Sequence, residues 1–163
     1  SIFWGSSGPL RNGKGSCYEG GYRLPCIVRW PGKVPAGRES DAVFATIDFM
    51  PTFANLCGFK APADRVIDGV DQTDLLLGKS ETGRETFYFD RAGIRRGKWK
   101  YLKAKAHFYG YAREDDRPVE EELYDLEKDL GETTNLAKKH PKIVAELREL
   151  TEELPAYRPD ERR

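Results

Sequence analysis

From Glu85 onward the pattern of the chain changes to short segments typical of β-strands. Four short segments show this pattern, each bounded by turn-forming residues: 85–90, 92–96, 98–104 and 121–126. They predict an antiparallel sheet of three or four strands. A helical period follows from Pro141, with one apolar stripe formed by Ile143, Val144, Leu147, Leu150 and Leu154. We expect this last helix to cover one face of the sheet.

The first half is irregular, because glycine and proline interrupt residues 5–37 repeatedly. Within that stretch the apolar run 24–30 predicts a short buried strand. A helix should follow Asp48 as its N-cap and end at Gly58, with an apolar face of Phe49, Phe53, Ala54 and Leu56. A second short helix is expected over residues 72–77, capped by Asp71 and stopped by Gly78.

Composition excludes several classes of function. With 163 residues and 39% hydrophobic content the chain can build one ordinary core. Its 27 basic and 27 acidic residues cancel, which argues against binding to nucleic acid or an anionic membrane surface, and no apolar run approaches the ~20 residues of a membrane helix. Because the chain starts at Ser1 instead of Met, we expect a fragment or a processed product.

The three cysteines have no metal-binding or disulfide-framework spacing. We expect Cys17 and Cys26 to pack as small hydrophobic side chains. Neither a zinc site nor a disulfide scaffold is predicted.

Residues 8–25 carry the strongest chemical signal. Glycines on both sides of Lys14 free the backbone to wrap a small anion while the ammonium points at it. A nucleotide phosphate loop is a poor fit, since Gly15 stands where the magnesium-binding hydroxyl should be. Taken alone, the segment is also compatible with an exposed lysine among ordinary turn glycines.

Five sequence blocks, in this order, favour the anion site over an ordinary exposed lysine: residues 8–37, 46–58, 68–78, 93–102 and 122–137. Together, from GPLRNGKGSCYEGG to ELYDLEKDLGETTNLA, they resemble the C-terminal third of the sulfatase (arylsulfatase) family. The resemblance implies that Lys14 contacts the sulfate group of a substrate and helps catalysis. An ammonium about 4 Å from a sulfate oxygen is worth roughly 4 kcal/mol at an effective dielectric constant of 20.

Three further residues invite a functional interpretation. Glu19 and Arg23 belong to the same block as Lys14, and they either tie the loop to the sheet or position Lys14. His107 lies in the aromatic run 107–111, which could stack on a ring of the substrate or form an ordinary loop.

The rest of the family's chemistry is not found in this sequence. The resemblance implies a formylglycine, made from Cys or Ser in C/S-x-P-x-R, and a divalent cation, usually calcium. Cys17, Cys26 and Cys57 lack this context, so we expect the nucleophile and the metal ligands upstream of residue 1. The scattered aspartates are better explained as caps and turn residues than as a cation site, and no metal site is predicted: Asp48, Asp68, Asp71 and Asp74.

The prediction is therefore an α+β fold, the C-terminal part of an alkaline-phosphatase-like α/β sulfatase. Residues 1–79 would close the larger α/β domain, and residues 80–163 would form a subdomain with a small antiparallel sheet packed against the terminal helix. The parent protein would hydrolyse an aryl or carbohydrate sulfate ester outside the cytoplasm, whereas this chain alone, without the remaining sulfatase polypeptide, would be inactive. The alternative is a non-catalytic module that binds sulfated glycans or serves assembly.

Overall fold

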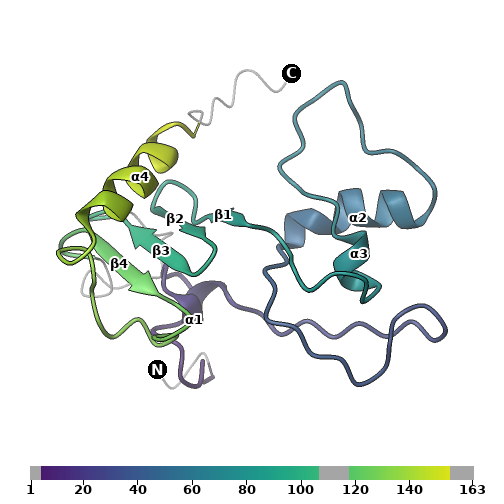
Figure 1. Cartoon of the computed structure of the whole chain (residues 1–163), viewed down its shortest axis with the longest axis horizontal. Coiled ribbons are helices and arrows are strands. Elements are labelled where there is room, and N and C mark those ends of the chain that lie inside the picture. Colours follow the sequence, from purple (N-terminus) through teal and green to yellow (C-terminus); the bar gives the residue numbers. More distant parts are fainter. Residues whose placement is uncertain (1–4, 107–117, 155–163) are drawn as a thin grey trace. The chain divides into compact units, whose positions relative to one another are not determined.

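The computed structural model describes residues 5–106 and 118–154 (Figure 1). Contacts divide the chain into two compact units, one made of Ser1–Leu24 with Tyr88–Arg163 and the other of Pro25–Phe87. Each is described separately below. The expected division at residue 80 concerns the domains of a longer protein and stays a prediction.

A four-stranded sheet forms the centre of the first unit. Its strands are β1 (Thr86–Tyr88), β2 (Gly93–Arg96), β3 (Trp99–Leu102) and β4 (Glu122–Asp125), in the order β1-β2-β3-β4. Strands β2 and β3 pair antiparallel, as do β3 and β4, so that Ile94 lies opposite Tyr101, and Tyr101 opposite Leu123. The expected antiparallel sheet is confirmed.

Helix α4 (Pro141–Glu152) packs on this sheet against β2 and β3 (Figure 1). The core between them consists of Ile94, Tyr101, Leu123, Val144 and Leu147, all buried, with Ile143 and Leu150 packed at its margin. Pro141 sits in the first turn, where its missing N–H breaks no helical hydrogen bond. The predicted apolar stripe thus faces the sheet, except for Leu154, which lies beyond the end of the helix and outside this core.

The second unit contains three short helical elements: η1 (Thr46–Asp48), α2 (Phe49–Leu56) and α3 (Thr73–Leu76). Helix α3 starts one residue later than predicted, with Gln72 at its N-cap in place of Asp71 and no side-chain capping bond. Asp71 instead accepts the N–H of Thr73 at 2.9 Å in the turn before the helix. The backbone of Gly78 adopts φ 75°, a left-handed conformation that suits glycine after a helix end, so the predicted stop is confirmed.

Asp48 stands at the N-cap of α2 as predicted, but its side chain makes no capping bond. The fully buried carboxylate of Asp48 does not bond to the first turn of α2. It accepts the N–H groups of Ala45 at 2.9 Å and Val70 at 2.8 Å, and it forms an ion pair with Arg84. A buried carboxylate with a cation and two N–H donors is far better satisfied than one capping bond would leave it. The predicted apolar face is wrong at Phe53, which is half exposed.

The buried strand expected over residues 24–30 is also wrong for this chain. These residues form no strand in the structure, and the side chain of Ile27 is 94% exposed. An extended segment is stabilised as a strand only when a neighbour satisfies its N–H and C=O groups, and the described residues provide none here. For the same reason Cys26 is exposed, contrary to expectation, whereas Cys17 is fully buried as predicted.

Candidate functional site

Lys14 lies at an exposed position of the loop that precedes helix α1 (Glu19–Tyr22). The loop turns tightly on both sides of it: Asn12 has φ 56° and Gly15 has φ 95°. The N–H of Ser16 donates to the carbonyl of Gly13 at 3.1 Å and closes the turn that carries the lysine. Lys14 is therefore an exposed residue on a folded turn of the backbone.

Two glycines of α1 allow the loop to lie directly against this helix. The N–H of Gly20 donates to the carbonyl of Arg11 at 3.0 Å. A Cβ atom at Gly20 would overlap the carbonyl oxygens of Arg11 and Asn12, and one at Gly21 would overlap that of Ser16. Glycine is needed at both positions because the backbones approach so closely.

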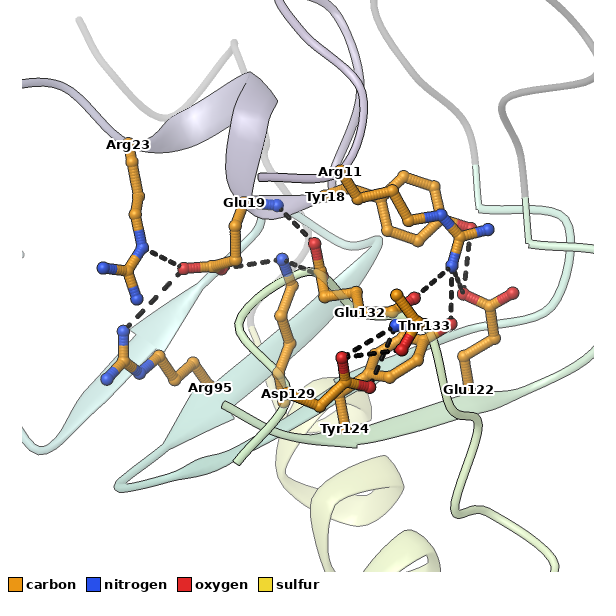
Figure 2. Close-up of polar contacts among 11 residues, drawn as sticks. Arg11, Tyr18, Glu19, Arg23, Arg95, Glu122, Tyr124, Asp129, Glu132 and Thr133 are labelled. Carbon is orange, nitrogen blue, oxygen red and sulfur yellow. Dashed lines mark hydrogen bonds and ion pairs between the residues drawn. The ribbon is translucent and has the colours of Figure 1, made fainter. Parts of the chain in front are cut away.

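Beyond the loop, Glu19 binds the sheet through a buried ion pair. Its Oε1 accepts from Nζ of Lys100 on β3 at 2.8 Å, and its Oε2 accepts from Nε of Arg23 at 2.5 Å. Arg95 on β2 places a guanidinium nitrogen 4.0 Å from the same carboxylate (Figure 2). Burial alone would raise the pKa of Glu19, but Lys100 and Arg23 outweigh it and lower that pKa, so Glu19 is ionised.

A second carboxylate, that of Glu132, shares the same lysine. Its Oε1 lies 2.7 Å from Nζ of Lys100, and its Oε2 accepts the backbone N–H of Glu19 at 2.7 Å. Both Lys100 and Glu132 are completely buried. Burial raises the pKa of Glu132, and the attraction of Lys100 offsets only part of that rise.

The start of the loop is held by Arg11. Its Nη1 donates to the hydroxyl of Tyr124 on β4 at 2.8 Å and to the backbone carbonyl of Glu132 at 2.9 Å. The guanidinium also stacks over the ring of Tyr18, 3.8 Å from its centroid. Tyr18 in turn donates to Glu122 Oε2 at 2.9 Å, and its pKa is raised by burial and by that carboxylate. Figure 2 shows this group on one side of Glu132 and Glu19 on the other.

Of the four residues singled out in the sequence, the structure brings together two, since Arg23 pairs with Glu19. Sequence reasoning missed Arg11, Lys100 and Glu132. Lys100 gave a usable signal, because it falls between Trp99 and Tyr101 in a strand, where a buried lysine requires a carboxylate partner. His107 lies outside the described residues.

No arrangement for a metal ion is found in residues 5–106 and 118–154: no three His, Cys, Asp or Glu side chains gather there in a way that could hold one. The residues described do not fit the calcium expected for the family. Among those same residues, no helix has the length and apolar character to cross a membrane.

Most of the chain matches known protein sequences. Residues 13–158 match the family described as N-sulphoglucosamine sulphohydrolase, C-terminal. The chain is 39% identical over 152 residues to an N-acetylgalactosamine-6-O-sulfatase of Bacteroides thetaiotaomicron, covering 89% of this chain and 30% of the relative. It is 33% identical over 177 aligned positions to human arylsulfatase A, covering 90% of this chain and 33% of the relative.

A solved structure shows the same architecture. It comes from work on glycosaminoglycan metabolism by Bacteroides thetaiotaomicron, and it matches with a TM-score of 0.78 and 38% identity over 90% of this chain and 32% of its own. This chain thus spans about a third of the length of the relatives that it matches. It belongs to the sulfatase family and corresponds to the C-terminal portion of its members.

Proposed function

We propose that the protein to which this chain belongs hydrolyses a sulfate ester, and that Lys14 contacts the sulfate group. The observation that carries the proposal is an exposed lysine on a folded glycine-bounded turn, in a loop that buried ion pairs hold against the sheet. The named relatives supply the reaction class, because both are sulfatases.

Lys14 would act by electrostatics. A sulfate ester gains negative charge on its leaving oxygen as the S–O bond breaks, and an ammonium fixed beside it stabilises that charge more in the transition state than in the ground state. A cation on a mobile loop would first have to be ordered, at a cost in entropy. The anchoring of residues 11–19 by Arg11, Glu19 and Glu132 supports this role, since it holds the turn in place before substrate arrives.

The remaining parts of the reaction are assigned to polypeptide outside residues 1–163. A formylglycine nucleophile and a divalent cation, expected to be calcium, would supply attack at sulfur and neutralise sulfate charge. The sequence has no Cys- or Ser-x-Pro-x-Arg segment, and the described residues contain no group of metal ligands. The chain alone should therefore show little or no turnover. Residues 24–30, with the exposed side chains of Leu24 and Ile27, are the proposed contact surface for that other polypeptide.

The substrate to test first is a carbohydrate sulfate. The relative at 39% identity is an N-acetylgalactosamine-6-O-sulfatase, so N-acetylgalactosamine 6-sulfate is the natural first probe, with a chromogenic aryl sulfate beside it. The complete reading frame should encode a Cys- or Ser-x-Pro-x-Arg segment ahead of Ser1, and its product should release sulfate from one of these esters. Binding of sulfated glycans without turnover, from a reading frame that lacks the segment, would favour a non-catalytic module instead.

A further inference from the structure

We propose that Glu132 is the positioning residue of the Lys14 loop, the group through which the sheet subdomain fixes both ends of the loop at once. This inference rests on the proposed function, because it assigns Glu132 an effect on sulfate ester hydrolysis through Lys14. Glu132 itself is buried and has no contact with the substrate in this account.

Two different groups of Glu132 hold the two ends of the loop. Its backbone carbonyl accepts from Arg11 Nη1 at 2.9 Å, three residues before Lys14. Its side-chain Oε2 accepts the N–H of Glu19 at 2.7 Å, five residues after Lys14. The carboxylate also lies 2.7 Å from Lys100, which holds the Glu19 side chain. Displacement of Glu132 would therefore release both ends together (Figure 2).

Hydrogen bonds and close packing of the backbone hold Glu132 in its position beside the loop. Glu132 has φ 53°, a left-handed conformation that is unfavourable for a residue with a side chain and persists only where its surroundings enforce it. The Asp129 carboxylate supplies that enforcement, since it accepts the N–H groups of Thr133 at 2.9 Å and Thr134 at 2.8 Å. A Cβ at the neighbouring Gly131 would lie 3.2 Å from the carbonyl oxygen of Pro9, so this turn packs against the chain that enters the loop.

The charge of Glu132 is matched to two donors. Oε2 accepts the N–H of Glu19, and Oε1 forms a 2.7 Å ion pair with the ammonium of Lys100, so each oxygen faces a positively polarised group. Glutamine has nearly the same shape but only one acceptor oxygen, and its NH2 group would face one of these donors. Glu132→Gln should therefore weaken the attachment of the loop without leaving a cavity at position 132.

The test is a double-mutant cycle in the full-length protein. Sulfate ester hydrolysis is measured for wild type, Glu132→Gln, Lys14→Ala and the double variant, with kcat and KM separated. We expect Glu132→Gln to lower kcat/KM about tenfold or more, mainly through kcat, because misplacement of a transition-state group by about 1 Å can cost up to a hundredfold. In the Lys14→Ala background the same change should cost less than about twofold.

A residue that only stabilises the fold would not show this coupling. Equal losses from Glu132→Gln with and without Lys14 would overturn the positioning role. No loss from Lys14→Ala would instead refute the proposed function, so the two failures are distinguishable. Glu146→Gln is the matched control, since this exposed glutamate pairs only peripherally with Arg96 at 2.9 Å, and it should leave kcat/KM unchanged.

If Glu132→Gln fails to fold, Arg11→Lys can replace it in the double-mutant cycle. Arg11 is only partly buried, and a lysine retains its charge while one ammonium replaces the guanidinium that reaches both Tyr124 and Glu132. The same cycle with Lys14→Ala should again show a loss of kcat that disappears once Lys14 is removed. Additive losses here would also contradict the inference.

Discussion

Nζ of Lys100 lies 2.8 Å from Oε1 of Glu19, although 81 residues separate them in the sequence. The same nitrogen is 2.7 Å from Glu132, so two buried carboxylates share a single fully buried ammonium. Lys100 also lies 4.2 Å from the centre of the Phe89 ring. The loop that carries Lys14 thus depends on a charge placed in the middle of strand β3.

Removal of the Lys100 charge should lower the free energy of unfolding. Lys100→Met leaves Glu19 and Glu132 buried beside each other without their common cation, and breaking a buried ion pair in this way costs roughly 3–5 kcal/mol. The free energy of unfolding, from denaturant titration, measures this. Lys138→Met is the control: its exposed pair with Glu120 should contribute less than about 1 kcal/mol. A Lys100→Met protein as stable as this control would show that the buried cluster is not needed for the fold.

The sheet and the last helix could be predicted because their sequence patterns are local signals. Val144 and Leu147 recur at helical spacing, and Ile94 and Tyr101 lie in short segments of strand-forming residues bounded by turn signals. The buried cluster could not be predicted in the same way. Glu132 lies in a polar turn that looks like a solvated loop, and only the three-dimensional pairing with Arg11 and Glu19 gives it a role.

The failed prediction for residues 24–30 has a different cause. Their apolar run is a correct strand signal, but a strand forms only where a neighbouring strand is present. The side chain of Asp48, at the predicted N-cap, makes no capping bond to α2 because it pairs with Arg84, 36 residues away.

Substitution of the α1 glycines should disturb the Lys14 turn directly. Gly20→Ala places a methyl group on the carbonyl oxygens of Arg11 and Asn12, which cannot move without displacing the loop. We expect at least a tenfold loss of kcat/KM in sulfate ester hydrolysis. Lys139→Ala is the control, because it changes an exposed residue of the same unit outside this loop. Similar activities for the two variants would contradict the close packing of loop and helix.

The ion pair of Asp48 with Arg84 should make stability depend on acid pH. Burial would raise the pKa of Asp48, but hydrogen bonds from Arg84, Val70 and Ala45 outweigh it and lower the pKa. A lowered carboxylate pKa adds stability that is complete above the unfolded value of about 3.9 and is lost as pH falls through the folded value. We therefore expect Asp48→Asn to cost about 3 kcal/mol at pH 7, and the gap to the wild type to narrow below about pH 4.

Unfolding free energies of both proteins between pH 7 and pH 2.5 check this. Asp64→Asn is a suitable control, since Asp64 pairs with Arg65 at an exposed position and should show little change at any pH. A gap between wild type and Asp48→Asn that stays constant on acidification would contradict the assignment.

Hydrogen exchange can test the proposed contact surface at residues 24–30. In this chain alone the segment forms no strand and exposes Leu24 and Ile27, so its amides should exchange almost as fast as in an unfolded peptide. In the full-length protein they should be protected, if other polypeptide covers them. Rapid exchange in both proteins would mean that this apolar run is not a contact surface. The amides of β3 serve as the internal standard, because they should be protected in both.

The most direct measurement of the central claim is kcat/KM for N-acetylgalactosamine 6-sulfate, or for the aryl sulfate turned over best, with Lys14→Ala in the full-length protein. The control is Lys139→Ala, which removes another exposed lysine of the same unit. We predict a loss of about 10²–10³ for Lys14→Ala, the size expected for one transition-state donor, and no change for Lys139→Ala. Equal activity of the two variants would show that Lys14 is an ordinary surface lysine and that the loop has no part in catalysis.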